Sequence, residues 1–213
     1  MKKTILVIAV FCVLVGGLAA QANPFDGRWV WDGRGARSPD RGELIFYGNI
    51  VLCESSYYTN YYIGDYFIFT DRTIYIIDVP TSSSYEEWEY SLQDSILTID
   101  FEYDGRFTFI KAPMEPGPLE GLWKTIGGDY CDEDETYYML FTGNIMAAGD
   151  EYGGYEGFRV DYRGKAFYLY LDGYEDIYSE EKYAVWAYEY RVNGRSLTII
   201  ENDGEELRLI KIY

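Results

Sequence analysis

The sequence predicts an all-β protein made of two tandem eight-stranded antiparallel up-and-down barrels. Three observations lead to this fold class. The second half of the chain repeats the first, each copy divides into short strands separated by tight turns, and no segment has the spacing of an amphipathic helix. The composition agrees, because 48% hydrophobic and 19% aromatic residues exclude a disordered chain and supply the apolar area that a small core needs.

The repeat consists of five matching segments that occur in the same order in both copies. They pair Phe25–Trp29 with Leu119–Trp123, Leu44–Ile50 with Met139–Ile145, Ile74–Ile76 with Phe167–Leu169, Leu97–Ile99 with Leu197–Ile199, and Phe109–Lys111 with Leu209–Lys211. The offset between the copies stays between 93 and 100 residues. Only two copies of this length indicate tandem domains rather than a solenoid, which stacks three or more units.

The start of the chain is typical of an export signal. Lys2 and Lys3 precede an apolar stretch, Ile5–Ala20, and Ala20-Gln21-Ala22 has the small-x-small pattern of a cleavage site. We therefore expect a mature protein that is periplasmic or extracellular. The chain divides into the signal peptide 1–22, barrel copy 23–112, a Pro- and Gly-rich linker 113–118, and barrel copy 119–213.

Eight strands are expected in each copy. In the first copy they lie near 27–32, 43–47, 50–54, 64–70, 73–79, 86–92, 96–102 and 106–111. Within 86–92, Trp88, Tyr90 and Leu92 alternate with polar residues, which is the period of a half-buried strand. Tight turns such as Gly48-Asn49 make successive strands antiparallel neighbours, and eight such strands can close without exposed edges.

The longer connections predict a barrel with two different ends. In the first copy they lie near 33–42, 55–63 and 80–85, and each follows an odd-numbered strand. They therefore share one end of the barrel, while the short turns close the other end. The second copy repeats this arrangement, so the long loops are expected to form a mouth or a lid.

A Gly-x-Trp motif opens the first strand of each copy, and this pattern resembles the lipocalin and calycin group. The nearest resemblance is to the short lipocalin-like domains of bacterial secreted proteins, although each copy is shorter than a typical lipocalin and lacks the helix after the last strand. The resemblance implies that the tryptophan seals the closed end under a basic residue, and that a small apolar ligand binds inside. The residues that carry it are Gly27, Trp29 and Lys111 in the first copy and Gly121, Trp123 and Lys211 in the second.

Aromatic residues supply the candidate ligand-binding sites. One set lies on the sixth strand of each copy, where it either lines a cavity or fills a small barrel: Trp88, Tyr90, Trp186, Tyr188 and Tyr190. A second set lies in the predicted mouth loops, where tyrosine is typical of surfaces that bind carbohydrate, peptide or protein: Tyr57, Tyr58, Tyr61, Tyr62, Tyr152 and Tyr155. The alternative for the second set is a solvated loop with some aromatic packing.

The loop after the first strand differs in charge between the copies. It is basic in the first copy, with Arg34, Arg37 and Arg41, and acidic in the second, with Asp129, Asp132, Glu133, Asp134 and Glu135. Two such loops are expected to attract each other and dock the copies together, in which case a disulfide between Cys53 and Cys131 is a further hypothesis. A calcium site and a solvated face are the alternatives for the acidic loop.

Charge and composition exclude several classes of function. Without Lys2 and Lys3 the chain has 16 basic against 36 acidic residues, which argues against nucleic acid and anionic membranes as partners. There is no histidine, so histidine zinc sites and the Ser-His triad are excluded. No catalytic motif is present, and we expect neither an enzyme nor a bound metal or cofactor.

The leading functional hypothesis is an exported, non-enzymatic binding module, with a small apolar ligand or an extracellular partner. One alternative is a structural or surface-interaction protein with filled barrels that binds through its tyrosine-rich loops. Another is an outer-membrane barrel, which the terminal Tyr213 favours. The predicted strands are shorter than the 9–11 residues that a membrane strand needs, so membrane insertion is not expected.

Overall fold

The computed structural model describes residues 23–33, 42–54, 61–77, 85–101, 105–129, 136–150, 153–172 and 183–212. Within these ranges the regular elements are β-strands, and no helix is long and apolar enough to cross a membrane. The predicted signal peptide and much of the predicted mouth loops lie outside the described residues. Below, the first half of the chain means the part up to Ala112, and the second half means the part from Leu119 onward.

The first half contains eight strands: β1 (Gly27–Trp31), β2 (Glu43–Tyr47), β3 (Ile50–Glu54), β4 (Tyr61–Phe69), β5 (Thr73–Ile77), β6 (Glu86–Gln93), β7 (Ile96–Phe101) and β8 (Gly105–Ala112). Each strand pairs antiparallel with the next, and β8 returns to pair with β1, with Trp29 opposite Lys111. The all-β prediction is therefore confirmed, and the chain contains a closed eight-stranded antiparallel barrel.

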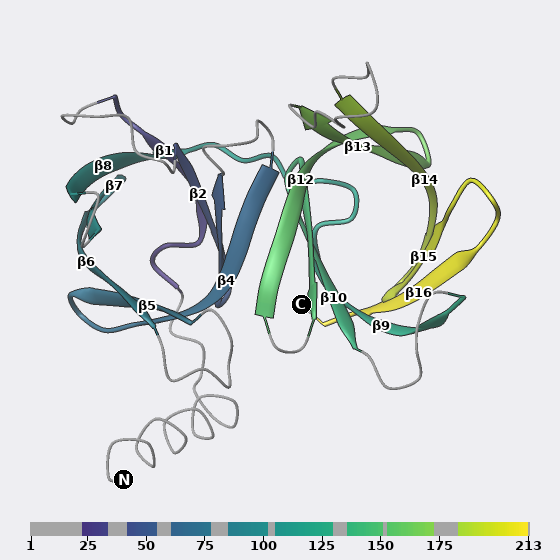
Figure 1. Ribbon diagram of the computed structural model, residues 1–213, viewed down its shortest axis with the longest axis horizontal. Helices are drawn as coiled ribbons and strands as arrows, with labels where there is room; N and C mark the ends of the chain where they lie inside the picture. The colour runs from purple at the N-terminus through teal and green to yellow at the C-terminus, as the bar shows by residue number, and fades with distance from the viewer. Residues whose placement is uncertain are drawn as a thin grey trace, which may run out of the picture.

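Eight further strands follow: β9 (Gly121–Gly128), β10 (Tyr137–Thr142), β11 (Ile145–Asp150), β12 (Gly153–Arg163), β13 (Ala166–Asp172), β14 (Tyr183–Asn193), β15 (Ser196–Ile200) and β16 (Glu206–Lys211). Their pairings include β11 with β12 and β16 with β9. In Figure 1 they lie beside the first barrel, with β4 and β12 next to each other between the two groups of strands.

Strands β4 and β12 hold the two halves together, because one segment of each strand pairs with the other half and another segment pairs within its own half. The start of β4 pairs with β12, whereas its end, from Tyr66 to Phe69, pairs with β5. In the same way β12 pairs first with β4 and then, from Arg159 to Arg163, with β13. We call the antiparallel pairing of Tyr61–Gly64 with Tyr155–Phe158 the seam. All sixteen strands consequently belong to one hydrogen-bonded sheet.

The seam lies where the sequence predicted a loop. The fourth strand was expected to begin near Gly64, but β4 begins at Tyr61. The run that precedes it, rich in tyrosine, has no alternating pattern and contains Asn60, so it resembles a loop by composition. Its pairing partner lies more than ninety residues away along the chain, and local sequence patterns do not report such a contact.

The buried residues of the described part form three hydrophobic clusters. The first lies inside the barrel of β1–β8 and the second among the inward residues of β9–β16. The third lies between the two halves and contains outward-facing residues such as Ile45, Leu52, Leu140 and Ala147. Burial of a side chain as large as Ile45 contributes about 1.5–3 kcal/mol, so this third cluster is a substantial interface.

Candidate functional site

The seam is built around two tyrosines that each face a glycine. Tyr155 lies opposite Gly64, and Tyr62 lies opposite Gly157, and both tyrosines are fully buried. A Cβ atom at Gly64 would lie 2.8 Å from Tyr155 Cβ, and one at Gly157 would lie 3.1 Å from Tyr62 Cβ. The glycines therefore allow the strands to meet, and the seam has local two-fold symmetry.

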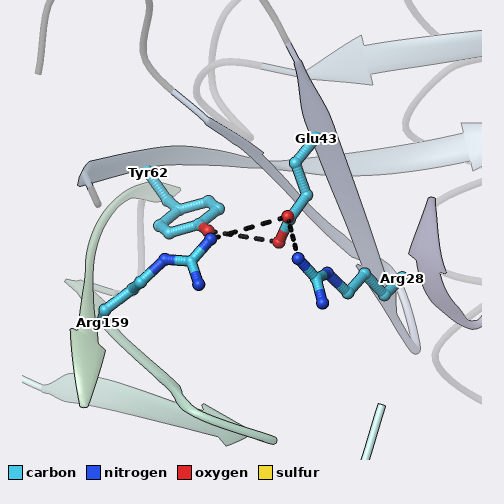
Figure 2. A network of polar contacts seen from close by, with 4 residues as sticks. All are labelled: Arg28, Glu43, Tyr62 and Arg159. Carbon is cyan, nitrogen blue, oxygen red and sulfur yellow. Dashed lines mark hydrogen bonds and ion pairs between the residues drawn. The ribbon is translucent and has the colours of Figure 1, made fainter. Parts of the chain in front are cut away.

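A buried carboxylate lies at the Tyr62 end of the seam (Figure 2). Glu43, at the start of β2, is only 4% exposed. Arg28 Nη2 donates to Glu43 Oε2 at 2.6 Å, and Tyr62 OH donates to Oε1 at 3.2 Å. Arg159 Nη2, from β12, lies 3.7 Å from Oε2. The ion pair between Glu43 and Arg159 thus connects the two halves of the chain.

The electrostatics of this cluster keep Tyr62 a hydrogen-bond donor. Burial, followed by the negative charge of Glu43, raises the pKa of Tyr62. The hydrogen bond to Glu43 likewise raises the pKa of Arg28. Glu54 lies beside the cluster, and burial followed by the charge of Glu43 raises its pKa. The Nε atoms of Arg28 and Arg159 are buried and have no hydrogen-bond partner within the described part of the chain.

The Tyr155 end of the seam has the same backbone but no charged network. Matching by strand register, Tyr138 occupies the position of Glu43, Leu122 that of Arg28, and Tyr66 that of Arg159. Tyr66 OH and Tyr155 OH lie 3.1 Å apart, and their rings pack edge to face. Burial, followed by the hydrogen bond with Tyr66, raises the pKa of Tyr155.

Both ends of the seam serve to join the halves, and the sequence did not predict the residues that do so. Glu43, Arg28 and Arg159 were not among the candidate site residues. A usable signal existed in the apolar runs Leu44-Ile45-Phe46 and Ile50-Val51-Leu52, which do not alternate. A strand of a barrel that is apolar at successive positions must bury both of its faces, which requires a second layer.

The predicted mouth-loop tyrosines that the structure describes lie elsewhere than expected. Tyr62 and Tyr155 were expected in the mouth loops, but they lie in β4 and β12 and are fully buried in the third cluster. The backbone of Tyr61 is also in β4, opposite Phe158. The remaining members of this set, Tyr57, Tyr58 and Tyr152, lie outside the described residues. The polar residues around these tyrosines suggested loops, but the segments form strands because their side chains are buried between the two halves.

The strand-six aromatics lie along the inside of their respective halves. Trp88 is fully buried in the first barrel, with its ring 5.0 Å from that of Phe101. Tyr90 packs against the same cluster, and its hydroxyl donates to Thr70 O at 2.7 Å. Tyr188 and Tyr190 pack against the second cluster. Trp186 differs from the others because it is 41% exposed.

The buried clusters inside the two halves differ in their aromatic content. Eight of the buried residues in the first cluster are aromatic, against three in the second. Strand register and the repeat match several larger residues of the first half with smaller or polar ones of the second: Phe25 with Leu119, Phe67 with Val160, Phe101 with Glu201, Phe107 with Leu207, and Phe109 with Leu209. One buried position differs in the opposite sense, because Phe167 lies where the first half has Ile74.

At two other matching positions the aromatic residues lie in the second half instead. Asp65 and Glu86 of the first half match Phe158 and Trp186 of the second. The rings of Phe158 and Trp186 lie 6.0 Å apart in an edge-to-face arrangement. The second half therefore has fewer fully buried aromatic residues than the first and carries an exposed tryptophan, Trp186, at one of these positions.

The Gly-x-Trp motif has the same geometry in both halves. Trp29 Nε1 donates to Phe25 O at 2.6 Å, and Lys111 Nζ lies 5.3 Å from the centroid of the Trp29 ring. Gly27 has a φ of +119°, and a Cβ there would lie 3.2 Å from Lys111 Cε, which explains the glycine. In the second half, Trp123 lies 5.5 Å from Lys211 Nζ, and Gly121 has a φ of +132°.

The remaining predicted residues are only partly described. Cys53 lies in β3 and packs against the first cluster, but Cys131 lies outside the described residues, so the disulfide remains a hypothesis. The charged residues of the predicted docking loops also lie outside, apart from Asp129, whose Oδ2 accepts a hydrogen bond from Glu206 N at 2.8 Å. Among the described residues, no group of three or more acidic or cysteine side chains is placed to hold a metal ion.

Comparison of the chain with models of known protein families and with curated proteins finds no match.

Proposed function

We propose that the chain is an exported, non-enzymatic binding protein made of two tandem lipocalin-like barrels, and that its second barrel binds a small apolar ligand. The pairing of β9–β16, in which β16 meets β9 and β11 meets β12, supports a second barrel. The matching contacts of Lys111 with Trp29 and of Lys211 with Trp123 support a common architecture. Residues 1–22, by their sequence, support export.

The observation that carries the ligand proposal is the difference between the two interiors. The first barrel fills its own interior with aromatic rings, as small eight-stranded barrels do. The second places Val160 and Leu209 where the first has Phe67 and Phe109, and places one larger ring, Phe167, where the first has Ile74. Smaller side chains at matching backbone positions leave more of the interior for a bound molecule.

The exposed ring of Trp186 supports the same proposal. An exposed tryptophan beside Phe158 offers a flat apolar surface, and an aromatic contact with a ligand contributes about 0.5–1.5 kcal/mol beyond burial of area. The tyrosines behind it, Tyr188 and Tyr190, combine an apolar body with a hydroxyl. Such a wall suits a largely apolar molecule with few polar groups.

The test combines native mass spectrometry of the mature protein with fluorescence titration, using a long-chain fatty acid, a sterol and an anilinonaphthalene dye as probes. We expect lipid-sized mass to co-purify, and at least one probe to change tryptophan emission. The double variant Val160→Phe with Leu209→Phe restores the rings of the first barrel and is expected to abolish binding. Ile126→Phe adds an aromatic ring at an exposed position and serves as the control.

The second candidate function is surface interaction with both barrels filled. The observation in its favour is the packed aromatic interior of the first barrel, which includes Trp29, Phe67 and Trp88. Bare protein mass together with unchanged tryptophan emission for every probe would reject the ligand proposal and favour this candidate.

A further inference from the structure

A pair of tyrosines lies on the outer face of the first barrel, between β5 and the start of β6. The rings of Tyr75 and Tyr85 lie 5.6 Å apart, edge to face, and Tyr85 is 57% exposed. Glu87 lies opposite Tyr75 in the β5–β6 pairing, and Glu89 lies opposite Thr73. Both glutamates are exposed. We call Tyr75, Tyr85, Glu87 and Glu89 the Tyr75 face.

The second half carries a cation at the matching place. Tyr168 matches Tyr75 in the repeat, and the guanidinium of Arg163 lies over its ring, 4.8 Å from the centroid. Arg163 Nη2 also lies 2.7 Å from Asp161 Oδ2, and Asp161 is directly opposite Tyr168 in the strand pairing. The chain therefore shows that a tyrosine in this setting accommodates an arginine side chain held by a neighbouring carboxylate.

The Tyr75 face has the tyrosine of this arrangement, but it has no arginine and its carboxylate lies on the other flank of the ring. Strand pairing matches Ile68 with Asp161, and Thr70 with Arg163 at the end of the strand. On the other side of the ring, Glu87 matches Ala187. Compared with the second half, the first half therefore lacks the arginine and has a carboxylate on the opposite flank of the tyrosine. Within the described residues, no cation lies over Tyr75 or Tyr85.

We propose that the Tyr75 face binds an arginine side chain in a basic segment of a partner protein. The guanidinium would stack on Tyr75, as that of Arg163 does on Tyr168, and would pair with the Glu87 carboxylate. Arginine suits this site because its planar group can stack on a ring and donate a forked pair of hydrogen bonds to one carboxylate. The net charge of −18 complements a basic partner and accelerates its approach.

This inference is independent of the ligand proposal, because the Tyr75 face lies on the outside of the first barrel. The probe is a fluorescently labelled peptide with three arginines separated by glycine and serine. Its affinity for the mature chain is measured by anisotropy at about 0.15 M salt, where attraction between exposed charges is largely screened beyond about 8 Å. The matched peptide has lysine in place of each arginine. We expect at least fivefold tighter binding of the arginine peptide.

Two variants test the site itself. Glu87→Ala installs the residue of the second half and is expected to weaken binding of the arginine peptide about threefold to fivefold, as loss of one charge-assisted contact implies. Glu115→Gln removes an equal charge from the exposed linker and should leave the affinity unchanged. Equal losses in the two variants would show a general charge effect and would overturn the proposal.

A third variant should block the site without removing it. Ile68→Asp with Thr70→Arg transfers the arrangement of Asp161 and Arg163 to the first half, so that the chain supplies its own guanidinium to Tyr75. We expect at least a fivefold loss of peptide affinity. If this variant does not fold, Tyr75→Leu removes the ring and should give the same loss. Full affinity in a folded version of either variant, or equal affinity for the lysine and arginine peptides, contradicts the proposal.

Discussion

The two ends of the seam share a backbone and differ in chemistry. At one end Glu43 is surrounded by Arg28, Arg159 and Tyr62. At the other end, the position of Glu43 belongs to Tyr138, and two tyrosine hydroxyls meet instead of charges. Because a buried carboxylate is costly without partners, the charged residues occur as a set on one side only. The other end has uncharged residues at all three of these positions, which indicates that the charged residues depend on one another.

The largest expected effect comes from removing the carboxylate of this set. Glu43→Ala leaves the Arg28 guanidinium and the Tyr62 hydroxyl without their acceptor and removes the ion-pair partner of Arg159. We expect it to lower the free energy of unfolding by about 3 kcal/mol. Tyr138→Ala removes more atoms at the matching position but no buried charge, so a loss of about 1 kcal/mol is expected. Urea denaturation of both variants measures the difference. Equal losses would mean that the charge does not matter at this end.

The next effect concerns the glycines. Gly64→Ala places a Cβ atom against Leu52 Cδ2, its nearest neighbour, and 2.8 Å from Tyr155 Cβ, so both the Leu52 side chain and the facing strand must move. Overpacking of this kind costs about 2 kcal/mol. Gly157→Ala makes a longer contact, 3.1 Å to Tyr62 Cβ, and should cost about 1 kcal/mol or less. Thermal unfolding of the two variants ranks them, and a larger loss for Gly157→Ala would contradict this order of contacts.

The smallest effect is a pH dependence at Glu54. Its pKa is raised in the folded protein above the ordinary value of 4.5, so the folded state binds a proton more tightly than the unfolded state. Its contribution to stability therefore rises as the pH falls from the raised pKa towards 4.5, and is unfavourable at neutral pH. Glu54→Gln should increase the free energy of unfolding at pH 7.5 by less than about 1 kcal/mol.

The same variant should have no advantage below pH 4.5, where Glu54 of the parent protein is protonated in both states. The exposed residue Glu156 provides a matched control as Glu156→Gln. Denaturant titrations at pH 7.5 and pH 4 measure both variants. A stabilisation of Glu54→Gln that is the same at the two pH values would show that its titration is not the cause.

Much of the barrel could be predicted because its signals are local. The alternation of Trp88, Tyr90 and Leu92 gave the sixth strand, and the Gly48-Asn49 turn gave the hairpin of β2 and β3. The start of β4 was wrong because its pairing partner is in the other half of the chain. A strand segment that pairs over such a distance gains its stability from that partner and need not show a pattern of its own.

The charged cluster could not be predicted for the same reason. Arg28 lies within the Gly-x-Trp motif, Glu43 opens an apolar run, and Arg159 lies in the middle of β12. No spacing between these residues indicates that they meet, because their proximity depends on how the halves pack. The unbroken apolar runs of β2 and β3 showed that something covers their outer faces, but not what covers them.

The symmetry of the seam bears on how substitutions can accumulate on its two sides. Tyr62 faces Gly157 as Tyr155 faces Gly64, so either half alone would present a self-complementary strand, the arrangement found in two-fold homodimers. In a homodimer every substitution appears on both sides of the axis at once. When both sides belong to one chain, each can change alone. The Glu43–Arg159 ion pair exists on one side only, an asymmetry that two identical subunits could not encode.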